Sequence, residues 1–409
     1  MSTQKIILHL DMNSYFASVE QQANPHLRGQ PIGICEHLGG IIIAPSVEAK
    51  RLGIKLGTTV WDARKKYPQI VLLPVDPDKY RGITAGFLRI LLDYTDKVEK
   101  SSIDEAFADL SEISRSFDDA LLLGLEIKQR LRQELGAWVS CSIGIGPNKL
   151  LAKIAADLGE GDIDRIFVVR PEDIPRLYER LKLTDVPGIA SRLEQALNKL
   201  GIFTLRQLAD YPLGNLLNQF GQPGYFLHKL ANFQDAGAII TQEYEEIKSI
   251  GHSYTLPKAV VELREIKKLM CKLAEKIGRR LRRKMARGNI VHYFHSDKRY
   301  FGFHKQRKLA EYVNDGSAIY RAAFRIFARA LPLQFPIKIM GVTVGGLRFE
   351  KAPLPLYPQY QSPARLTEVM DRINDKYGEF VIRSARLLDI PEEWAKDTVG
   401  FGRMKELSV

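Results

Sequence analysis

The sequence has few cysteines, and none of them belongs to a metal-binding motif. The 409 residues contain three cysteines, Cys35, Cys141 and Cys271, which are scattered, odd in number and without any CxxC pair. This spacing argues against a disulfide framework and against a zinc knuckle. We expect three buried thiols in a reducing compartment.

The sequence also lacks long apolar runs and a recognisable targeting segment. No hydrophobic run approaches the ~18 residues that a membrane-spanning helix needs. The chain reaches Asp11 without a basic segment followed by an apolar one, so no signal peptide is indicated. We therefore expect a cytoplasmic protein, a monomer, with no membrane partner.

Acidic residues are in deficit. The chain has 60 Lys and Arg against 48 Asp and Glu, a formal net charge of +12, although 45% of its residues are hydrophobic. A folded protein with a basic surface suggests a polyanionic partner. The excess is concentrated between Pro257 and Lys308, with seventeen basic and four acidic residues. The DNA-contacting residues expected there are Arg279, Arg280, Arg282 and Arg283.

Three acidic residues lie in apolar surroundings, where a carboxylate needs a compensating cation. Asp104 and Glu105 stand in the segment SIDEAF, and Asp11 ends the apolar run 6–10, which predicts a buried strand. If two strands bring these positions together, the acids surround divalent cations, and Mg²⁺ is the expected ion. An adjacent pair of acids is by itself more often a solvated surface.

The order of the expected elements predicts a split βαβ sheet. Strands at 6–10, 102–110 and 138–145 alternate with helices at 80–97 and 119–135. In the second helix, the residues spaced for a buried face are Leu122, Leu125, Ile127 and Leu131. The lysine that follows a glycine turn at 144–148, Lys149, opens another helix and is suited to bind an anion.

The second half of the chain predicts two further modules. Short helices at 171–236 surround the turn VPGI, which indicates a helix-hairpin-helix or an ordinary helix turn. After a polar linker, strands are expected at 250–256, 290–294, 299–304 and 337–345, with helices at 262–285 and 317–331. The tail is rich in proline as far as Pro363 and then predicts one helix, at 366–377.

Five segments, taken in order, resemble the Y-family translesion DNA polymerases, the DinB/UmuC group that includes bacterial polymerases IV and V. They are LDMNSYFASVE at 10–20, SIDEAF at 102–107, GIGPNKLLAK at 144–153, VPGI at 186–189 and KSIGH at 248–252. The resemblance covers residues 5–350, with a related tail beyond, and the ordered set is very specific.

The resemblance implies an α+β multidomain fold with the form of a right hand. Its expected parts are a split-βαβ palm at 1–14 and 80–170, small fingers at 15–79, a helical thumb with a helix-hairpin-helix at 171–236, a linker at 237–243, a β-α-β-β-α-β little finger that binds DNA at 244–350, and a tail at 351–409.

The same resemblance implies an enzyme, a template-directed DNA polymerase of low fidelity that adds deoxynucleotides to a primer 3′ end. It would act in translesion synthesis during DNA repair and the SOS response. The catalytic residues and metal ligands are expected to be Asp11, Asp104 and Glu105, with the Met12 carbonyl, around two Mg²⁺ ions.

The expected nucleotide and DNA contacts also follow from the resemblance. Phe16 falls at the steric gate, an aromatic ring that rejects a ribose 2′-hydroxyl, and Tyr15 is expected beneath the sugar. Lys50 and Lys149 are expected to hold the triphosphate of a deoxynucleotide. Gly188 is expected to contact the primer–template DNA.

Several positions differ from those of many relatives. Ala44, Val47 and Lys50 replace Thr, Tyr and Arg in the fingers, and Asn13 replaces a common acid. These substitutions resemble the polymerase V branch more than the polymerase IV branch. Lys50 keeps the charge but loses the guanidinium fork, so nucleotide binding is a point at which an accessory protein could act. A UmuD-like protein or a recombinase is the candidate partner.

A sliding clamp is another candidate partner. Relatives carry a clamp-binding peptide of the type QLxLF in the tail, and this chain has Leu354, Leu356 and Tyr357 there without the initial Gln.

Two other functions remain open from the residues. A DNA-binding accessory protein could use the same scaffold with weak or partner-dependent catalysis, although Asp11, Asp104 and Glu105 are all present. A nucleotide cyclase on a related palm would share the sheet and the acids, but it would not need a helix-hairpin-helix or a basic C-terminal module.

Overall fold

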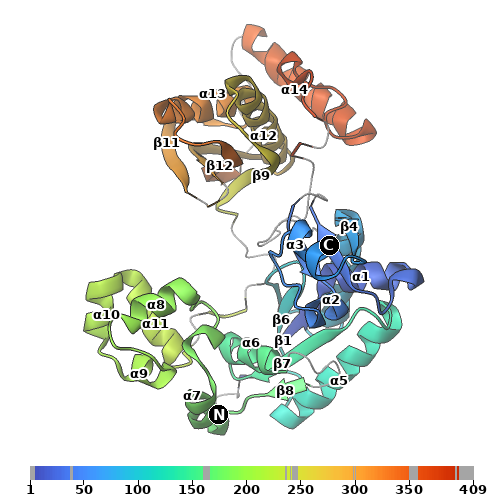
Figure 1. Ribbon diagram of the computed structural model, residues 1–409, viewed down its shortest axis with the longest axis vertical. Helices are drawn as coiled ribbons and strands as arrows, with labels where there is room; N and C mark the ends of the chain where they lie inside the picture. The colour runs from blue at the N-terminus through green and yellow to red at the C-terminus, as the bar shows by residue number, and fades with distance from the viewer. Residues whose placement is uncertain are drawn as a thin grey trace. The chain divides into compact units, whose positions relative to one another are not determined.

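The computed structural model describes residues 5–36, 40–159, 166–234, 237–239, 241, 247–297, 299, 301–349, 358–391 and 394–395. These residues form two compact units, one before and one after the segment around residue 245 (Figure 1). None of the helices in this part of the chain is long and apolar enough to span a membrane.

The first unit is built around a five-stranded sheet with the strand order β5-β6-β1-β7-β8. Its strands are β5 (Val98–Lys100), β6 (Glu105–Asp109), β1 (Ile7–Met12), β7 (Cys141–Gly146) and β8 (Ile166–Val168). β1 runs antiparallel to both β6 and β7. The apolar run that predicted a buried strand therefore forms the centre of this sheet.

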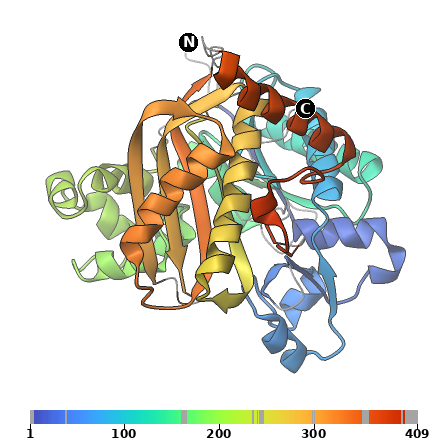
Figure 2. The same cartoon turned by 90° about the horizontal axis from the view of Figure 1, so that it is seen from above.

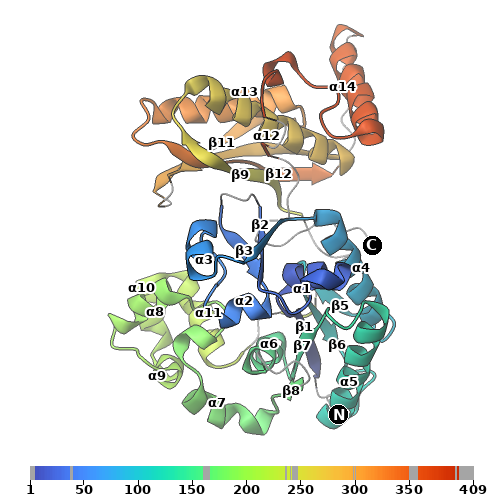
Figure 3. The same cartoon turned by 45° about the vertical axis from the view of Figure 1, so that its right-hand side comes forward.

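Helices lie on both sides of the five-stranded sheet (Figure 3). Side chains of β1 such as Leu8 and Leu10 share one core with α4 (Pro77–Leu92) and α5 (Phe117–Glu134). α6 (Lys149–Leu158) packs on the opposite face of β7. Gly144 allows this close approach, because a Cβ atom there would lie 2.0 Å from the carbonyl oxygen of Ala152.

A smaller three-stranded sheet is inserted after β1. Its order is β3 (Ile42–Pro45), β2 (Ile32–Cys35) and β4 (Val71–Pro74). On one face, residues such as Ile34 join the main core beside α1 (Tyr15–Ala23). On the other, Cys35 and Ile42 pack with α2 (Val47–Arg51) and α3 (Val60–Lys66) in a separate small core.

Short helices complete the first unit. They are α7 (Ile174–Arg180), α8 (Ser191–Asn198), α9 (Leu205–Asp210), α10 (Leu213–Phe220) and α11 (Gln222–Ala231), with 3₁₀ turns at Pro25–Leu27, Pro171–Asp173 and Leu183–Asp185. The turn before α8 contains Gly188 at a φ of 102°, a conformation that favours glycine. The element before this turn is a 3₁₀ turn rather than a full helix.

The second unit is a four-stranded antiparallel sheet with two helices on one face (Figure 2). The sheet order is β11 (Gly302–Val313), β10 (Ala286–Ser296), β12 (Ile337–Phe349) and β9 (Ser249–Val260). α12 (Leu263–Arg283) and α13 (Gly316–Phe327) pack on it through a shared core. Two 3₁₀ turns follow, at Ala328–Ala330 and Ala385–Leu387.

The tail helix α14 (Pro358–Tyr377) belongs to the second unit and pairs with α12 through charges. Arg282 binds Asp371 with two hydrogen bonds of 2.6 and 2.9 Å. Arg279 and Arg283 both donate to Asp375. Three arginines of α12 are therefore paired with two acids of α14, and even Arg279 is buried in the unit.

Two expectations about the helices are wrong. Of the four residues expected on the buried face of α5, Ile127 and Leu131 are buried, but Leu122 and Leu125 are 66% and 46% exposed, and Ala120 and Gly124 complete the face. The helix expected at 80–97 ends at Leu92, because the chain turns there into β5. The spacing thus identified the C-terminal half of the buried face of α5 but not its first half.

Candidate active site

The register of β1 and β6 brings the three predicted acids to one end of the five-stranded sheet. Asp11 is paired with Glu105 across the two strands, so their side chains share a face. Asp104 precedes β6, and its carbonyl accepts a 3.0 Å hydrogen bond from the Met12 amide. Because the chain bends before Glu105, the adjacent acids do not have to point to opposite faces.

Crowding perturbs the protonation of these acids. Burial, together with the carboxylates of Glu105 and Asp104, raises the pKa of Asp11 to about 8. Burial also raises the pKa of Asp104, although a hydrogen bond from Ser102 opposes it. The positive charge near the three partly buried carboxylates is therefore too small to keep all of them ionised.

Two residues that the sequence analysis missed stabilise Glu105. Burial would raise the pKa of this carboxyl group, but His9 and Lys153 outweigh it and lower the pKa to about 2. The Lys153 ammonium lies 2.7 Å from one carboxylate oxygen, and the His9 Nε2 atom lies 3.8 Å from the other. His9 precedes Asp11 by two residues on the same face of β1, a spacing that could have identified it.

The donor set suits a divalent cation. Ligand atoms of His9, Asp11 and Glu105 lie within 4.8 Å of one another. Both ring nitrogens of His9 are buried without a hydrogen-bond partner, and burial lowers the pKa of this imidazole. Carboxylates that repel each other, one of them with a raised pKa, are the ligands that a hard cation would stabilise.

The two aromatic residues after β1 have different environments. Tyr15 is buried, and its hydroxyl group lies 2.7 Å from the Tyr80 carbonyl oxygen and 2.8 Å from the Thr84 hydroxyl. Tyr15 therefore joins α1 to α4. Phe16 is only half-buried and stacks on Tyr80, with ring centroids 4.3 Å apart. Of the two rings, Phe16 is the one that is partly exposed.

Lys149 lies away from the acids. It follows Gly146, which is paired with Ile7 at the far end of β1 from Asp11. Its ammonium group lies 3.1 Å from Glu99 and 3.2 Å from the carbonyl oxygen of Ala238. The structure thus places Lys149 away from the acids, and Lys153, one helical turn later, is the lysine at the acidic site. The contact of Lys149 with a triphosphate stays a prediction.

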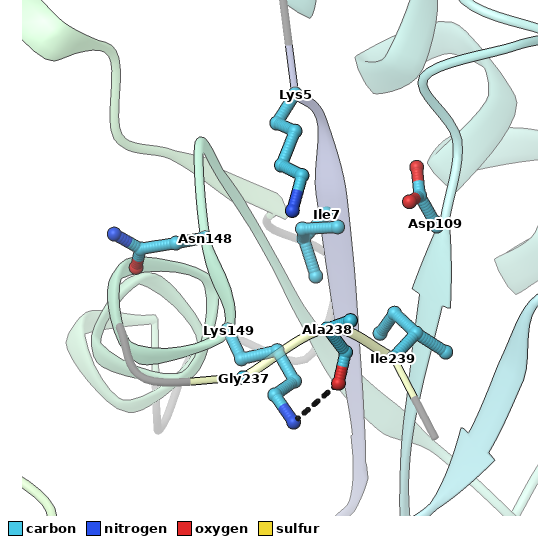
Figure 4. Close-up of a pocket in the computed structure, with 8 residues that line it drawn as sticks. All are labelled: Lys5, Ile7, Asp109, Asn148, Lys149, Gly237, Ala238 and Ile239. Carbon is cyan, nitrogen blue, oxygen red and sulfur yellow. Dashed lines mark hydrogen bonds between the residues drawn. The ribbon is translucent and has the colours of Figure 1, made fainter. Parts of the chain in front are cut away.

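Lys149 instead borders a pocket of about 390 Å³ (Figure 4). The other residues that line this pocket are Lys5, Ile7, Asp109, Asn148, Gly237, Ala238 and Ile239. The segment 237–239 crosses the sheet there, where Ile239 packs on Ile7 and Phe107. Lys149 thus fastens this segment to the sheet.

The remaining predicted residues are placed as follows. Lys50 is exposed on α2, and Gly188 is exposed in its turn. Arg280 donates to the Gly251 carbonyl oxygen, and Arg279, Arg282 and Arg283 pair with the acids of α14. The contact of these four arginines with DNA stays a prediction. The clamp-binding residues expected in the tail, Leu354, Leu356 and Tyr357, lie outside the described residues.

Comparisons with known proteins agree with this geometry. The model of the impB/mucB/samB family matches residues 10–157, and the model of that family's C-terminal domain matches residues 247–354. The chain belongs to the impB/mucB/samB family. A DNA polymerase IV of Pelotomaculum thermopropionicum is 35% identical over 93% of this chain and 94% of the relative.

Other relatives of this family give the same result. A DNA polymerase IV of Moorella thermoacetica is 35% identical over 94% of this chain and 96% of its own length, and DNA polymerase IV 2 of Bacillus subtilis is 33% identical over 95% and 96%. The structure of a Y-family DNA polymerase chimera superposes with a TM-score of 0.75 at 24% identity, over 84% of this chain and all of that one.

These findings confirm the expected α+β right-hand fold and a DNA-directed DNA polymerase of the Y-family. The accessory-protein alternative is not favoured. The three relatives are all named DNA polymerase IV, so they favour that branch over the polymerase V branch that the fingers substitutions suggested.

Asp11→Asn should stabilise the metal-free polymerase at alkaline pH. An Asp with an ordinary pKa near 4 in the unfolded chain and about 8 in the folded chain favours folding at low pH. This contribution to folding stability is lost as the pH rises towards 8 and Asp11 ionises beside the other carboxylates. The neutral side chain of the variant is not repelled by them. In EDTA we expect a melting temperature above that of the wild type at pH 8 and similar to it at pH 4.5, measured by calorimetry.

The control is Asp78→Asn, at an exposed acid that pairs with Arg81. This variant should have the melting temperature of the wild type at both pH values. An Asp11→Asn variant that is less stable than the wild type at pH 8 in EDTA would contradict the repulsion.

Proposed function

We propose that this polymerase carries out translesion synthesis by adding deoxynucleotides to a primer 3′ end with the aid of two Mg²⁺ ions. The observation that carries the proposal is the convergence of Asp11, Asp104 and Glu105 at one end of the five-stranded sheet. The cytoplasm, where chromosomal DNA and deoxynucleoside triphosphates are present, is the compartment we propose for it.

The three acids, with the Met12 carbonyl, are the proposed ligands of the ions. Bound Mg²⁺ would activate the primer 3′-hydroxyl and neutralise the charge of the triphosphate. Lys153 holds Glu105 in its ionised form, so this carboxylate is ready to bind a cation at neutral pH. Ser102 orients Asp104, since its hydroxyl donates to that carboxylate.

The described elements support the proposed division of the right hand. The five-stranded sheet with α4, α5 and α6 is the proposed palm, and the three-stranded sheet with α1, α2 and α3 is the proposed fingers subdomain. α7 to α11 are the proposed thumb, and β9 to β12 with α12 and α13 the proposed little finger. We keep the domain boundaries at 14, 79, 170, 236, 243 and 350.

We propose that the little finger contacts DNA through the edge strand β11 rather than through α12. Arg279, Arg282 and Arg283 of α12 already have acidic partners in α14, and displacing these arginines would leave the carboxylates unpaired. The edge strand β11 instead carries Lys305, Arg307 and Lys308, all exposed. We propose that these residues contact the phosphates of primer–template DNA.

Asp104→Ala should abolish primer extension. Loss of this carboxylate removes a proposed ligand, and we expect the rate to fall by about a thousandfold or more. The measurement is extension of a primed single strand with Mg²⁺ and all four deoxynucleotides. The exposed Asp118, which pairs with Arg170, offers a control, since Asp118→Asn should extend normally. Wild-type rates in the Asp104 variant would refute the assigned site.

Phe16→Ala should admit ribonucleotides. Phe16 is fixed by stacking on Tyr80, so its ring can exclude a 2′-hydroxyl, and removal should reduce discrimination between the sugars by about tenfold or more. Single-nucleotide insertion kinetics with matched deoxy- and ribonucleotides measure this ratio. Phe16→Tyr keeps the ring and should keep the discrimination. An unchanged ratio in the alanine variant would reject Phe16 as the gate.

Neutralising β11 should reduce the salt dependence of DNA binding. Each lost phosphate contact lowers the log–log slope of affinity against salt by about 0.9, so changing Lys305, Arg307 and Lys308 to Gln should lower it by about two to three. Fluorescence anisotropy with a labelled primer–template measures the slope. Arg282→Gln is the contrasting variant and should leave the slope unchanged. The reverse pattern would assign DNA contact to α12.

A further inference from the structure

The most exposed tryptophan of the described chain lies on the outer face of the fingers subdomain. Trp61, on α3, is 68% exposed, whereas Trp138 and Trp394 are both half-buried. The buried face of α3 is supplied by Val60 and Ala63, which pack in the small fingers core. The fold therefore does not use the indole of Trp61 for packing, and a large apolar ring is kept in water.

Basic side chains surround this ring. The Lys65 ammonium lies 5.3 Å from the centroid of Trp61, one helical turn along α3. Arg64 is exposed beside it. Residues 47–67 contain six basic residues and two acidic ones, Glu48 and Asp62.

The two acids reduce the positive charge of this segment but do not cancel it, because six basic residues outnumber them. Glu48 accepts a 3.1 Å hydrogen bond from Gln21, on α1. Asp62 accepts a 2.7 Å hydrogen bond from Thr59, the residue that caps α3. The charge around the indole is therefore positive.

An exposed apolar residue that precedes β3 is joined to the residue that caps α3. Ile41 is 39% exposed and forms a β-bridge with Thr59, two residues before Trp61. The Val60 amide donates to the Gly40 carbonyl oxygen with a 3.0 Å bond, so the start of α3 is held rigidly against the strand. An aromatic plane on a rigid helix loses little entropy when a ligand stacks on it.

An aromatic ring flanked by cations matches single-stranded DNA in both chemistry and charge. Bases stack on exposed indoles whatever their identity, and phosphates pair with the neighbouring lysine and arginine. A duplex would not suit this surface, because its bases are already stacked on each other. A basic surface also repels a cationic protein, so a protein partner with few acidic residues is disfavoured.

We infer that Trp61, Arg64 and Lys65 form a binding platform for single-stranded DNA, with a base stacked on the indole and the backbone held by the two cations. The inference rests on the proposed polymerase function in one respect: the strand it would hold is the unpaired template ahead of the primer end. The platform would retain that strand through stacking, without reading its sequence.

The decisive test compares two primer–templates, with unpaired template overhangs of one and eight nucleotides. The apparent KM for DNA in single-nucleotide insertion should be about tenfold lower with the long overhang for the wild type. Trp61→Ala should lose this preference and use the short overhang as well as the wild type does. Trp61→Phe, which keeps a ring, should keep most of the preference. Leu122→Ala removes an equally exposed apolar side chain on α5 and should keep it entirely.

Equal overhang preference in wild type and Trp61→Ala would overturn the platform while leaving the polymerase function intact. If the wild type extends neither template, the proposed function fails and the platform is judged by fluorescence alone. Addition of (dT)8 should quench tryptophan emission in the wild type, and Trp61→Phe should abolish the quench because the two remaining tryptophans are half-buried. The same quench in both proteins would overturn the platform.

Discussion

The carboxylates of Asp11 and Glu105 repel each other across two hydrogen-bonded strands, and much of the first unit serves to keep them together. The antiparallel register of β1 with β6 sets them opposite one another, and the Met12 amide anchors the bend that adds Asp104. Separating these acids would require breaking the central strands of the sheet. The fold therefore keeps an electrostatic repulsion that a bound cation would remove. The same repulsion that destabilises the metal-free sheet favours the binding of a metal ion.

The acids could be found from the sequence because burial leaves a clear signal. A carboxylate at the end of an apolar run has few structural explanations, and the run itself predicted the central strand β1. The lysine at the site could not be chosen in the same way. Lys149 and Lys153 are one turn apart on α6, and which of them reaches the acids depends on how α6 lies along β7, a packing detail set by contacts such as that at Gly144.

Helix phase shows the same limit. In α5, Ile127 and Leu131 are buried as their spacing predicted, yet Leu122 and Leu125 are exposed and Gly124 faces the sheet one turn earlier. Gly124 illustrates the reason, since a Cβ atom at this position would lie 3.0 Å from Ile166 of β8. Close packing of a helix on a sheet can select small residues, so the most hydrophobic side of a helix is not always its buried side.

Counting charges located a basic region but not the charges that are available to DNA. The cluster at the end of α12 is the densest in the sequence. Three of its four arginines pair with Asp371 and Asp375, acids almost a hundred residues later that no local pattern connects to it. Once those pairs are removed from the count, the exposed basic residues of β11 and α3 become the better candidates. When a cation forms an ion pair with an acid far away in the sequence, the two charges cancel each other's long-range field. The partner of each charge, more than the number of charges, therefore decides where a polyanion can bind.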